Sequence, residues 1–333
     1  MKIDIYSHIL PERYFRKLLD KAPTELNLEK RVKTIPCLKD LSKRFQIMDS
    51  FEAYFQVLVL GSPPIEMVAG PNETPELARI ANDEIAELVT KSPDRFLAGV
   101  ACLPMNNKDA AAGELDRAIK ELNLKGVQIF TQVNGKPLDD QDFSFVFKKM
   151  AEYDLPIFLH PARGVHFPDY TSEKKSRYEI WFCFGWPYET SAAMTRIIFS
   201  GVFDKYPNLK IITHHLGGMI PYFNERIRSS YDQFGTRTDE DGSRLLAQLK
   251  KHPYEYFRMF YADTAVNGSI PAMECGLAFF SANRIVFGTD MPYDIEKGYR
   301  HIRKTIESIE AMTASNEDRK KIYETNARKL LKL

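Results

Sequence analysis

The sequence contains few cysteines, and they form no pattern. Its 333 residues include only four, Cys37, Cys102, Cys183 and Cys275, and no two of them make a Cys-x-x-Cys pair. A disulfide framework needs grouped cysteines in a small secreted chain, and a cysteine-based zinc site needs paired ones. Both classes are therefore excluded, and we expect reduced cysteines that serve as packing residues.

The chain also lacks an excess of either charge. Lysine and arginine total 46 against 45 aspartates and glutamates, which leaves a net charge of +1. No basic cluster is long enough to follow a phosphate backbone. We therefore expect no nucleic-acid partner.

Long hydrophobic segments are missing as well. The opening MKIDIYSH lacks the charged and apolar regions of a signal peptide, and no apolar run approaches the roughly 18 residues that a membrane span requires. These absences predict no membrane association and a cytoplasmic location.

The sequence does contain a regular alternation of short apolar segments and helical patterns. Strands are expected at 2–11, 55–61, 96–103, 126–130, 157–160, 209–215, 259–263 and 285–290, and helices near 12–20, 38–50, 75–91, 107–122, 142–153 and 187–205. Eight strands that alternate with helices favour a parallel sheet closed into a (β/α)₈ TIM barrel. We expect residues 1–333 to form one such domain.

The connections between these elements differ in length. Helix-to-strand links are short, whereas the links after strands one, two and five are long, at about 9–50, 61–74 and 161–186. In a barrel of this type the strand-to-helix loops build the active-site face. The third loop is rich in aromatic residues, namely His166, Phe167, Tyr170, Tyr178, Trp181, Phe182, Phe184 and Trp186. It is expected to cover a ligand, although packing on the barrel rim would also explain it.

Polar residues suited to metal chemistry lie where strands end. Tyr6 and His8 share one face of the first strand, because side chains two apart in a strand point the same way. His160, His215 and Asp290 end the fifth, sixth and eighth strands. Imidazoles and a carboxylate can hold a zinc-like ion and leave a position open for substrate. The pattern therefore predicts a metal site at this end of the barrel.

Longer motifs at the same places resemble a known family. They are IFLHP at 157–161, GWPYET at 185–190, SGVFDKYPNLK at 200–210, HLGGMIP at 215–221 and FGTDMPY at 287–293. Together they resemble the decarboxylase branch of the amidohydrolase superfamily, which includes aminocarboxymuconate-semialdehyde decarboxylase and γ-resorcylate decarboxylase. The likeness covers nearly the whole chain, and its specificity comes from the five motifs occurring in order.

This resemblance implies metal-dependent, non-oxidative decarboxylation of a small conjugated or aromatic carboxylic acid. It implies His8, His160 and Asp290 as ligands of one divalent ion, Zn²⁺ foremost and Mn²⁺ as the alternative, with no organic cofactor. It also implies that His215 is the general acid and base, with Asp290 beside it in catalysis. The neighbouring His214 is expected to point to the other side of its strand. A homodimer is expected, as in related enzymes.

Tyr6 departs from the family, whose members usually carry histidine or a carboxylate at this position. A phenol with a pKa of about 10 is a poor ligand unless the ion removes its proton. Three roles remain open for Tyr6: a phenolate ligand, a hydrogen-bond donor to a substrate oxygen or a water, and a residue that only fills the barrel.

Candidate substrate-binding residues are arginines and aromatics near the strand ends. Arg31, Arg44 and Arg163 are candidates for holding the substrate carboxylate, because a guanidinium offers it a fork of donors. Trp186 and Tyr293 suit a flat, conjugated acid. Trp186 is equally explained as an anchor for the helix that follows it.

Two other functions fit the same sequence. One is a hydrolase or hydratase, for example a lactonase, in which Asp290 or His215 activates a water. The other is a barrel that has lost its metal through Tyr6 and serves in binding or regulation, since a fold alone does not establish a function.

Overall fold

The core of the molecule is a closed ring of parallel strands. The computed structural model describes residues 1–22 and 28–333. Its strands are β1 (Lys2–Ile9), β2 (Tyr54–Leu60), β3 (Phe96–Gly99), β4 (Ala101–Cys102), β5 (Val127–Phe130), β8 (Ile157–His160), β9 (Ile211–Thr213), β10 (Tyr261–Asp263) and β11 (Ile285–Val286). They pair in the orders β1-β2-β3 and β4-β5-β8-β9-β10-β11, all parallel.

Two junctions join these runs into one barrel. β3 and β4 together form one strand position of the barrel. They are separated by Val100, whose amide donates to the Leu58 carbonyl. At the other junction the backbone of β1 bonds to the segment after β11, with Ile5 N donating to the Phe287 carbonyl at 2.9 Å. The predicted (β/α)₈ barrel is thus confirmed.

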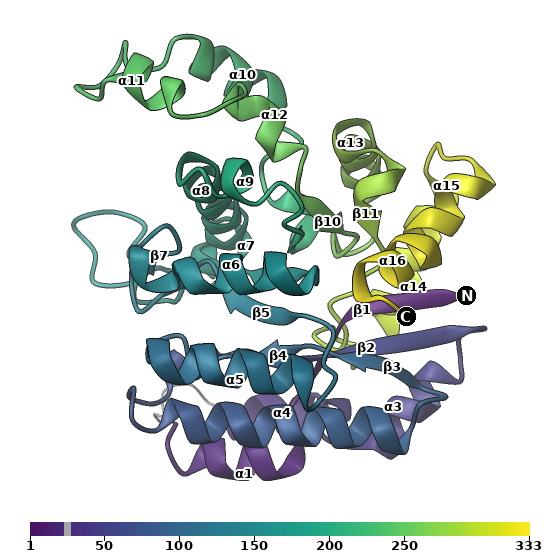
Figure 1. Ribbon diagram of the computed structural model, residues 1–333. Helices are drawn as coiled ribbons and strands as arrows, with labels where there is room; N and C mark the ends of the chain where they lie inside the picture. The colour runs from purple at the N-terminus through teal and green to yellow at the C-terminus, as the bar shows by residue number, and fades with distance from the viewer. Residues whose placement is uncertain (23–27) are drawn as a thin grey trace.

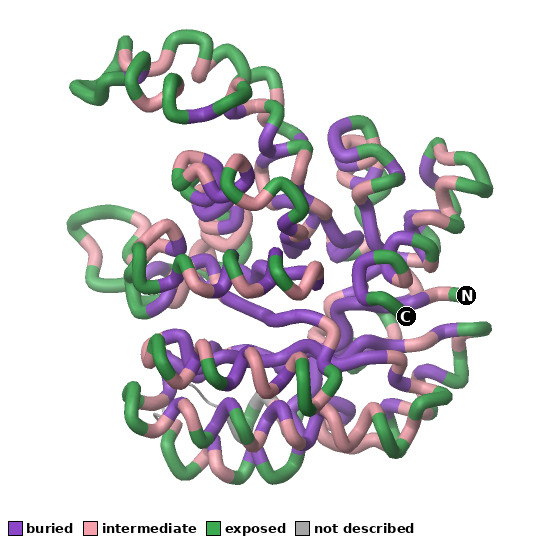
Figure 2. The backbone as a smooth tube through the Cα atoms, in the orientation of Figure 1, coloured by how far each residue is buried: buried purple, intermediate pink, exposed green. Residues whose placement is uncertain are grey.

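Helices surround the ring and cover its outer face (Figure 1). They are α1 (Glu12–Leu19), α2 (Leu28–Thr34), α3 (Leu41–Met48), α4 (Thr74–Lys91), α5 (Lys108–Lys120), α6 (Ser144–Tyr153), α7 (Ile180–Cys183), α8 (Gly185–Phe199), α9 (Val202–Lys205), α13 (Ile270–Phe280), α14 (Tyr299–Ala311), α15 (Asn316–Lys320) and α16 (Asn326–Leu331). The strands are buried throughout most of their length while the helices expose one side (Figure 2). This burial on both faces explains why the strands read as nearly continuous apolar runs.

Two excursions leave the barrel. A small hairpin, β6 (Gln132–Val133) and β7 (Lys136–Pro137), follows β5, and α10 (Asn224–Asp232), α11 (Gly242–Ala247) and α12 (Pro253–Phe257) lie between β9 and β10. The second excursion projects from the barrel, and much of it is exposed (Figures 1 and 2). Among the described residues, no helix has the length and apolar character to cross a membrane.

Several expected elements have other bounds in the structure; for example, the strand expected at 285–290 ends at Val286 and the one at 96–103 is interrupted at Val100. The helix predicted at 187–205 is divided into α8 and α9 at Gly201, whose φ of 72° is left-handed. The strand predicted at 209–215 ends at Thr213, because His215 and Leu216 both have a φ of 54°. Such left-handed residues cannot continue a strand.

A buried carboxylate, that of Asp4, holds the barrel closed where β1 meets its neighbours. Asp4 accepts hydrogen bonds from the Tyr54 hydroxyl at 2.5 Å, the Thr289 hydroxyl at 2.5 Å, the Thr289 amide at 3.0 Å and the Tyr6 amide at 3.1 Å. Burial raises the pKa of Asp4 to about 6, although these donors oppose the shift. Asp4 therefore ties β1 to β2 and to the segment that carries Asp290.

Candidate active site

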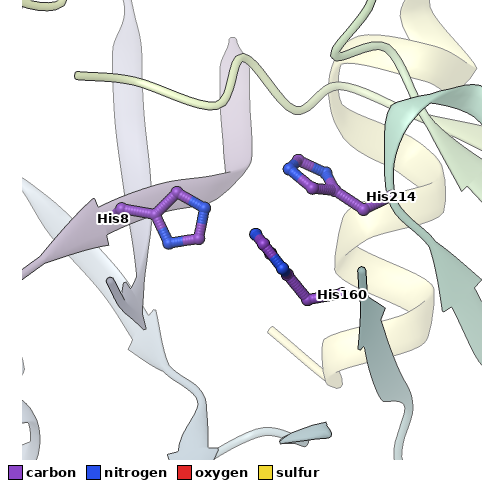
Figure 3. A group of neighbouring side chains, drawn as sticks. All are labelled: His8, His160 and His214. Atoms are coloured by element: carbon purple, nitrogen blue, oxygen red, sulfur yellow. The ribbon is translucent and has the colours of Figure 1, made fainter. Parts of the chain in front are cut away.

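Four histidines and one aspartate meet at the carboxyl ends of the strands. His8 comes from β1, His160 from β8, His214 and His215 from the end of β9, and Asp290 from the segment after β11. One group of potential ligand atoms, all within 4.8 Å of one another, comprises His8, His160 and His214, and a second comprises His214, His215 and Asp290. Figure 3 shows the rings of the first group converging from three directions. The predicted strand-end residues are thus brought together, with His214 added.

Asp290 lies between the histidines. Its Oδ1 is 3.2 Å from His8 Nε2 and 3.4 Å from His214 Nε2, and its Oδ2 is 3.7 Å from His215 Nε2. Burial raises the pKa of Asp290, but the contacts with His214, His215 and His8 outweigh it and hold that pKa well below its usual range. Asp290 is therefore an ionised carboxylate that faces three imidazoles.

The site is deepest at three of the histidines and opens at the fourth. The side chains of His8 and His214 are 0% exposed and His160 is 2% exposed, whereas the side chains of His215 and Asp290 are 18% and 15% exposed. A ligand that enters from solvent would meet His215 and Asp290 first.

Burial keeps most of these imidazoles neutral. Desolvation lowers the pKa of His8, and desolvation together with the neighbouring histidines lowers that of His160 much further. The pKa of His215 is also lowered, by burial and by His214. Neutral imidazoles offer the lone pair that a metal ion requires.

His214 differs because it has a carboxylate partner. Burial lowers its pKa, but the charge of Asp263 and the Nδ1 hydrogen bond to that carboxylate prevail and raise the pKa to about 9. The other oxygen of Asp263 accepts the amides of Leu216 at 3.2 Å and Ala265 at 3.0 Å. Asp263 thus orients both the ring of His214 and the turn that follows β9.

The expectation that His214 points away from the site is wrong. It assumed strand alternation through residue 215, but β9 ends at Thr213 and His215 has left-handed backbone. The turn places the rings of His214 and His215 on the same side, with centroids 3.8 Å apart.

Asp263 was not among the predicted site residues either. It ends β10 as His160 ends β8, so the rule of polar residues at strand ends would have found it.

Tyr6 lies inside this cluster and contacts its rings. It is fully buried, stacks on His214 with centroids 4.0 Å apart, and lies 5.6 Å from the His8 ring. Its hydroxyl has no hydrogen-bond partner among the described residues. Burial, followed by the charges of Asp263 and Asp290, raises the pKa of Tyr6 well above its usual value. The phenol is thus neutral in this setting.

Two aromatic side chains flank the histidines. The Trp186 ring lies 5.3 Å from His160 and 5.9 Å from His215, and its Nε1 donates to the Arg163 carbonyl at 2.9 Å. The Tyr293 ring lies 5.3 Å from His8. Both predicted aromatic residues therefore border the site.

The three arginines have different settings. Arg44 is fully buried and donates to the Gln56 side chain at 2.7 Å, the Cys37 carbonyl at 3.1 Å and the His8 carbonyl. Its donors are thus engaged inside the protein, so its prediction as a substrate ligand is wrong: Arg44 supports the strand that carries His8.

Arg163 remains near the site, and its guanidinium pairs with Glu189 at 2.9 Å and lies over the Phe167 ring at 4.9 Å. The side chain of Arg31 lies outside the described residues.

The aromatic side chains of the loop at 161–186 differ in their exposure to solvent. Trp186 faces the histidines, but Tyr170, Tyr178 and Phe184 are 72%, 87% and 66% exposed. Only part of this aromatic loop therefore borders the site.

Comparison with known proteins identifies the family. The sequence profile of the Amidohydrolase family matches residues 48–333. The chain belongs to the amidohydrolase family. It is 32% identical over 302 residues to a γ-resorcylate decarboxylase of a Polaromonas species, covering 87% of each protein. It is 32% identical over 257 residues to 2-amino-3-carboxymuconate-6-semialdehyde decarboxylase of Dictyostelium discoideum, covering 77% of this chain and 67% of that protein.

Solved structures of this amidohydrolase branch have the same fold. A dihydroxybenzoic acid decarboxylase from Polaromonas with bound manganese and 2-nitroresorcinol superposes with a TM-score of 0.79 at 29% identity, covering 100% of this chain and 97% of the other. A 5-carboxyvanillate decarboxylase from Novosphingobium aromaticivorans, also with manganese, gives a TM-score of 0.82 at 27% identity, covering 100% and 96%. The resemblance inferred from the motifs is confirmed, and the histidine cluster suits one divalent ion.

Proposed function

We propose that this protein is a metal-dependent, non-oxidative decarboxylase of a small aromatic or conjugated carboxylic acid, acting as a single barrel domain. The observation that carries the proposal is the meeting of His8, His160, His215 and Asp290 at one end of the barrel. Decarboxylation by the relatives of known activity supports the reaction class.

His8, His160 and Asp290 are proposed to hold the ion, with zinc as the first expectation and manganese as the alternative. The donors fit, since neutral imidazoles and one carboxylate form an open site for such an ion. When bound, the ion would polarise a substrate oxygen and offset the negative charge that develops during the reaction. Manganese in two related structures supports the alternative metal.

The protein's own residues would then bind the acid and move a proton. His215, on the solvent side, would take up a proton from solvent and deliver it to the carbon that bears the carboxylate, since its imidazole is otherwise neutral. The electron pair of the broken carbon–carbon bond returns to the conjugated system as CO₂ leaves. Asp290, 3.7 Å from His215, would hold the imidazole in position for this transfer.

Trp186 and Tyr293 would form the walls that receive a flat substrate, because their rings border the histidines from two sides. Arg163 would bind a substrate carboxylate by giving up its ion pair with Glu189 and pairing with the substrate instead. Arg31 stays a prediction for the same role.

The first test is a panel of aromatic and conjugated acids, with released CO₂ measured after metal removal and after restoration with Zn²⁺ or Mn²⁺. We expect CO₂ release that depends on the metal and that falls at least about 1000-fold in His160→Ala, because Lewis-acid assistance contributes several kcal/mol. Elemental analysis of protein purified without chelator would identify the metal. Ring opening of lactones without CO₂ release would instead favour the hydrolase.

We also propose a homodimer that works in the cytoplasm. Exposed aromatic side chains on the 161–186 loop and an apolar groove between α8 and α10, lined by Met219, Phe223 and Tyr231, support a second copy as a partner. Sedimentation equilibrium would give twice the mass of one chain, and a single-chain mass would refute the dimer.

A further inference from the structure

We propose that His214 is a metal ligand and takes the place of the first-strand ligand that Tyr6 has replaced. The ion would then be held by His8, His160, His214 and Asp290. This assignment rests on the proposed function, because it requires that the site hold a metal ion.

The spacing of the donor atoms of His8, His214 and Asp290 supports His214 as a ligand. Ligands about 2.1 Å from one ion lie about 3.0 to 3.4 Å apart for angles between about 90° and 109°. Oδ1 of Asp290 is 3.2 Å from His8 Nε2 and 3.4 Å from His214 Nε2. Both nitrogens are buried, and neither has a hydrogen-bond partner among the described residues. Each nitrogen therefore lies at the distance from Asp290 Oδ1 that separates two ligands of one ion, without the alignment of a hydrogen bond.

The outer hydrogen bonds of the three imidazoles follow one pattern. Nδ1 of His8 is 3.3 Å from the Leu60 carbonyl, and Nδ1 of His160 is 2.8 Å from the Pro161 carbonyl. A carbonyl oxygen can only accept, so Nδ1 carries the hydrogen and Nε2 keeps its lone pair.

His214 matches this pattern, with Asp263 as the acceptor at Nδ1. A histidine ligand usually donates its other N–H to a carbonyl or a carboxylate, which fixes the ring and raises its basicity. An ion at Nε2 would displace any proton held there.

Tyr6 has the properties of a packing residue in this arrangement. Its ring lies against the face of His214, with an interplanar angle of 18°. The Phe158 ring packs edge-on against Tyr6 as well, with centroids 5.4 Å apart. Tyr6 would therefore hold His214 in place and leave coordination to the imidazole.

The backbone turn after β9 separates the roles of the two adjacent histidines. His214 is extended, with φ −75° and ψ 156°, whereas His215 is left-handed. His214 is thereby placed deep in the site, and His215 stays at the solvent side. One strand end thus supplies both a ligand and the residue proposed to move the proton.

The test compares metal binding in Tyr6→Phe, His214→Ala, His215→Ala and His160→Ala with that of the wild type. Each protein is stripped of metal and titrated with Zn²⁺ against a chromophoric chelator. We expect Tyr6→Phe and His215→Ala to bind like the wild type. His214→Ala and His160→Ala should bind more than about 100-fold more weakly, since loss of an outer partner alone costs about 10- to 100-fold.

A second measurement avoids the variants, in case one of them fails to fold. X-ray absorption of the zinc-loaded wild type counts imidazole ligands directly, and three are expected. Circular dichroism of each metal-free variant would show whether the fold is kept.

Three outcomes would overturn the assignment. Wild-type affinity in a folded His214→Ala protein, or two imidazoles in the absorption spectrum, would remove His214 from the ligand set. Loss of metal in Tyr6→Phe would make the phenol a ligand instead. A wild type that binds no divalent ion would refute the metal requirement of the proposed function as well, so the two failures can be told apart.

Discussion

The rings of Tyr6 and His214 lie face to face, with centroids 4.0 Å apart and planes inclined by 18°. Tyr6 is fully buried, and its hydroxyl lacks a hydrogen-bond partner among the described residues. The ring therefore contributes through packing rather than through its hydroxyl.

This contact predicts different effects for two substitutions of Tyr6. Tyr6→Phe keeps the ring and should change the free energy of unfolding by less than about 1 kcal/mol. Tyr6→Ala leaves a cavity beside His214 and should cost about 3 to 5 kcal/mol. Urea unfolding of the metal-free proteins measures both values. Equal losses in the two variants would show that the hydroxyl carries the stabilisation.

His215→Asn should lower kcat by about 10² to 10⁴ while leaving metal content and fold unchanged, because it removes only the group that moves the proton. Steady-state kinetics and elemental analysis check this. The matched control is His252→Asn, since His252 caps α12 by accepting the Tyr254 amide at 3.3 Å and lies 3.5 Å from Asp232, away from the histidine cluster. A His215→Asn enzyme with more than a tenth of wild-type kcat would contradict the role.

Much of the barrel and its site was predictable because both depend on local patterns. Apolar runs mark the strands, and a parallel barrel places the ends of all its strands on one face. That rule alone brought His8, His160 and Asp290 together. It needed no knowledge of how the side chains pack.

The errors arise where long-range contacts or unusual backbone decide the outcome. Arg44 is held by Cys37, Gln56 and His8, and nothing in a sequence shows that an arginine will find buried acceptors. The orientation of His214 depends on the left-handed backbone of His215. Non-glycine residues seldom adopt that conformation, so strand alternation was the natural but wrong assumption.

Asp263→Asn should weaken metal binding by about 10- to 100-fold through loss of the acceptor for His214 Nδ1. The asparagine oxygen can still accept the amides of Leu216 and Ala265, so the turn should persist. Zinc titration measures the affinity. Asp204→Asn is the control, because Asp204 accepts the Tyr256 hydroxyl instead. Equal affinity in wild type and Asp263→Asn would mean that this carboxylate does not support a ligand.

Arg44→Met should destabilise the protein by about 3 kcal/mol or more, because it leaves three buried acceptors without their donor. KM should stay nearly unchanged. Thermal unfolding and kinetics test the two statements together. Arg16→Met is a suitable control, since the Arg16 side chain is 75% exposed and pairs with Glu12 in its own helix. A raised KM with normal stability would return Arg44 to the substrate site.

The burial of Glu66 should make the free energy of unfolding depend on pH. Glu66 is buried and accepts the Met105 amide at 2.8 Å, and burial raises its pKa from 4.5 to about 7. Between these values the native protein binds more protons than the unfolded chain, so stability falls as pH rises, by on the order of 3 kcal/mol from this group.

Glu66→Gln removes that titration, and it should therefore gain stability relative to the wild type as pH rises from about 4.5 to above 7. Urea unfolding at pH 4.5, 6 and 8 measures the difference. Glu76→Gln serves as the control, because the Glu76 side chain is 57% exposed and the substitution should change stability little. A constant difference between Glu66→Gln and wild type across this range would show that Glu66 titrates alike in the folded and unfolded states.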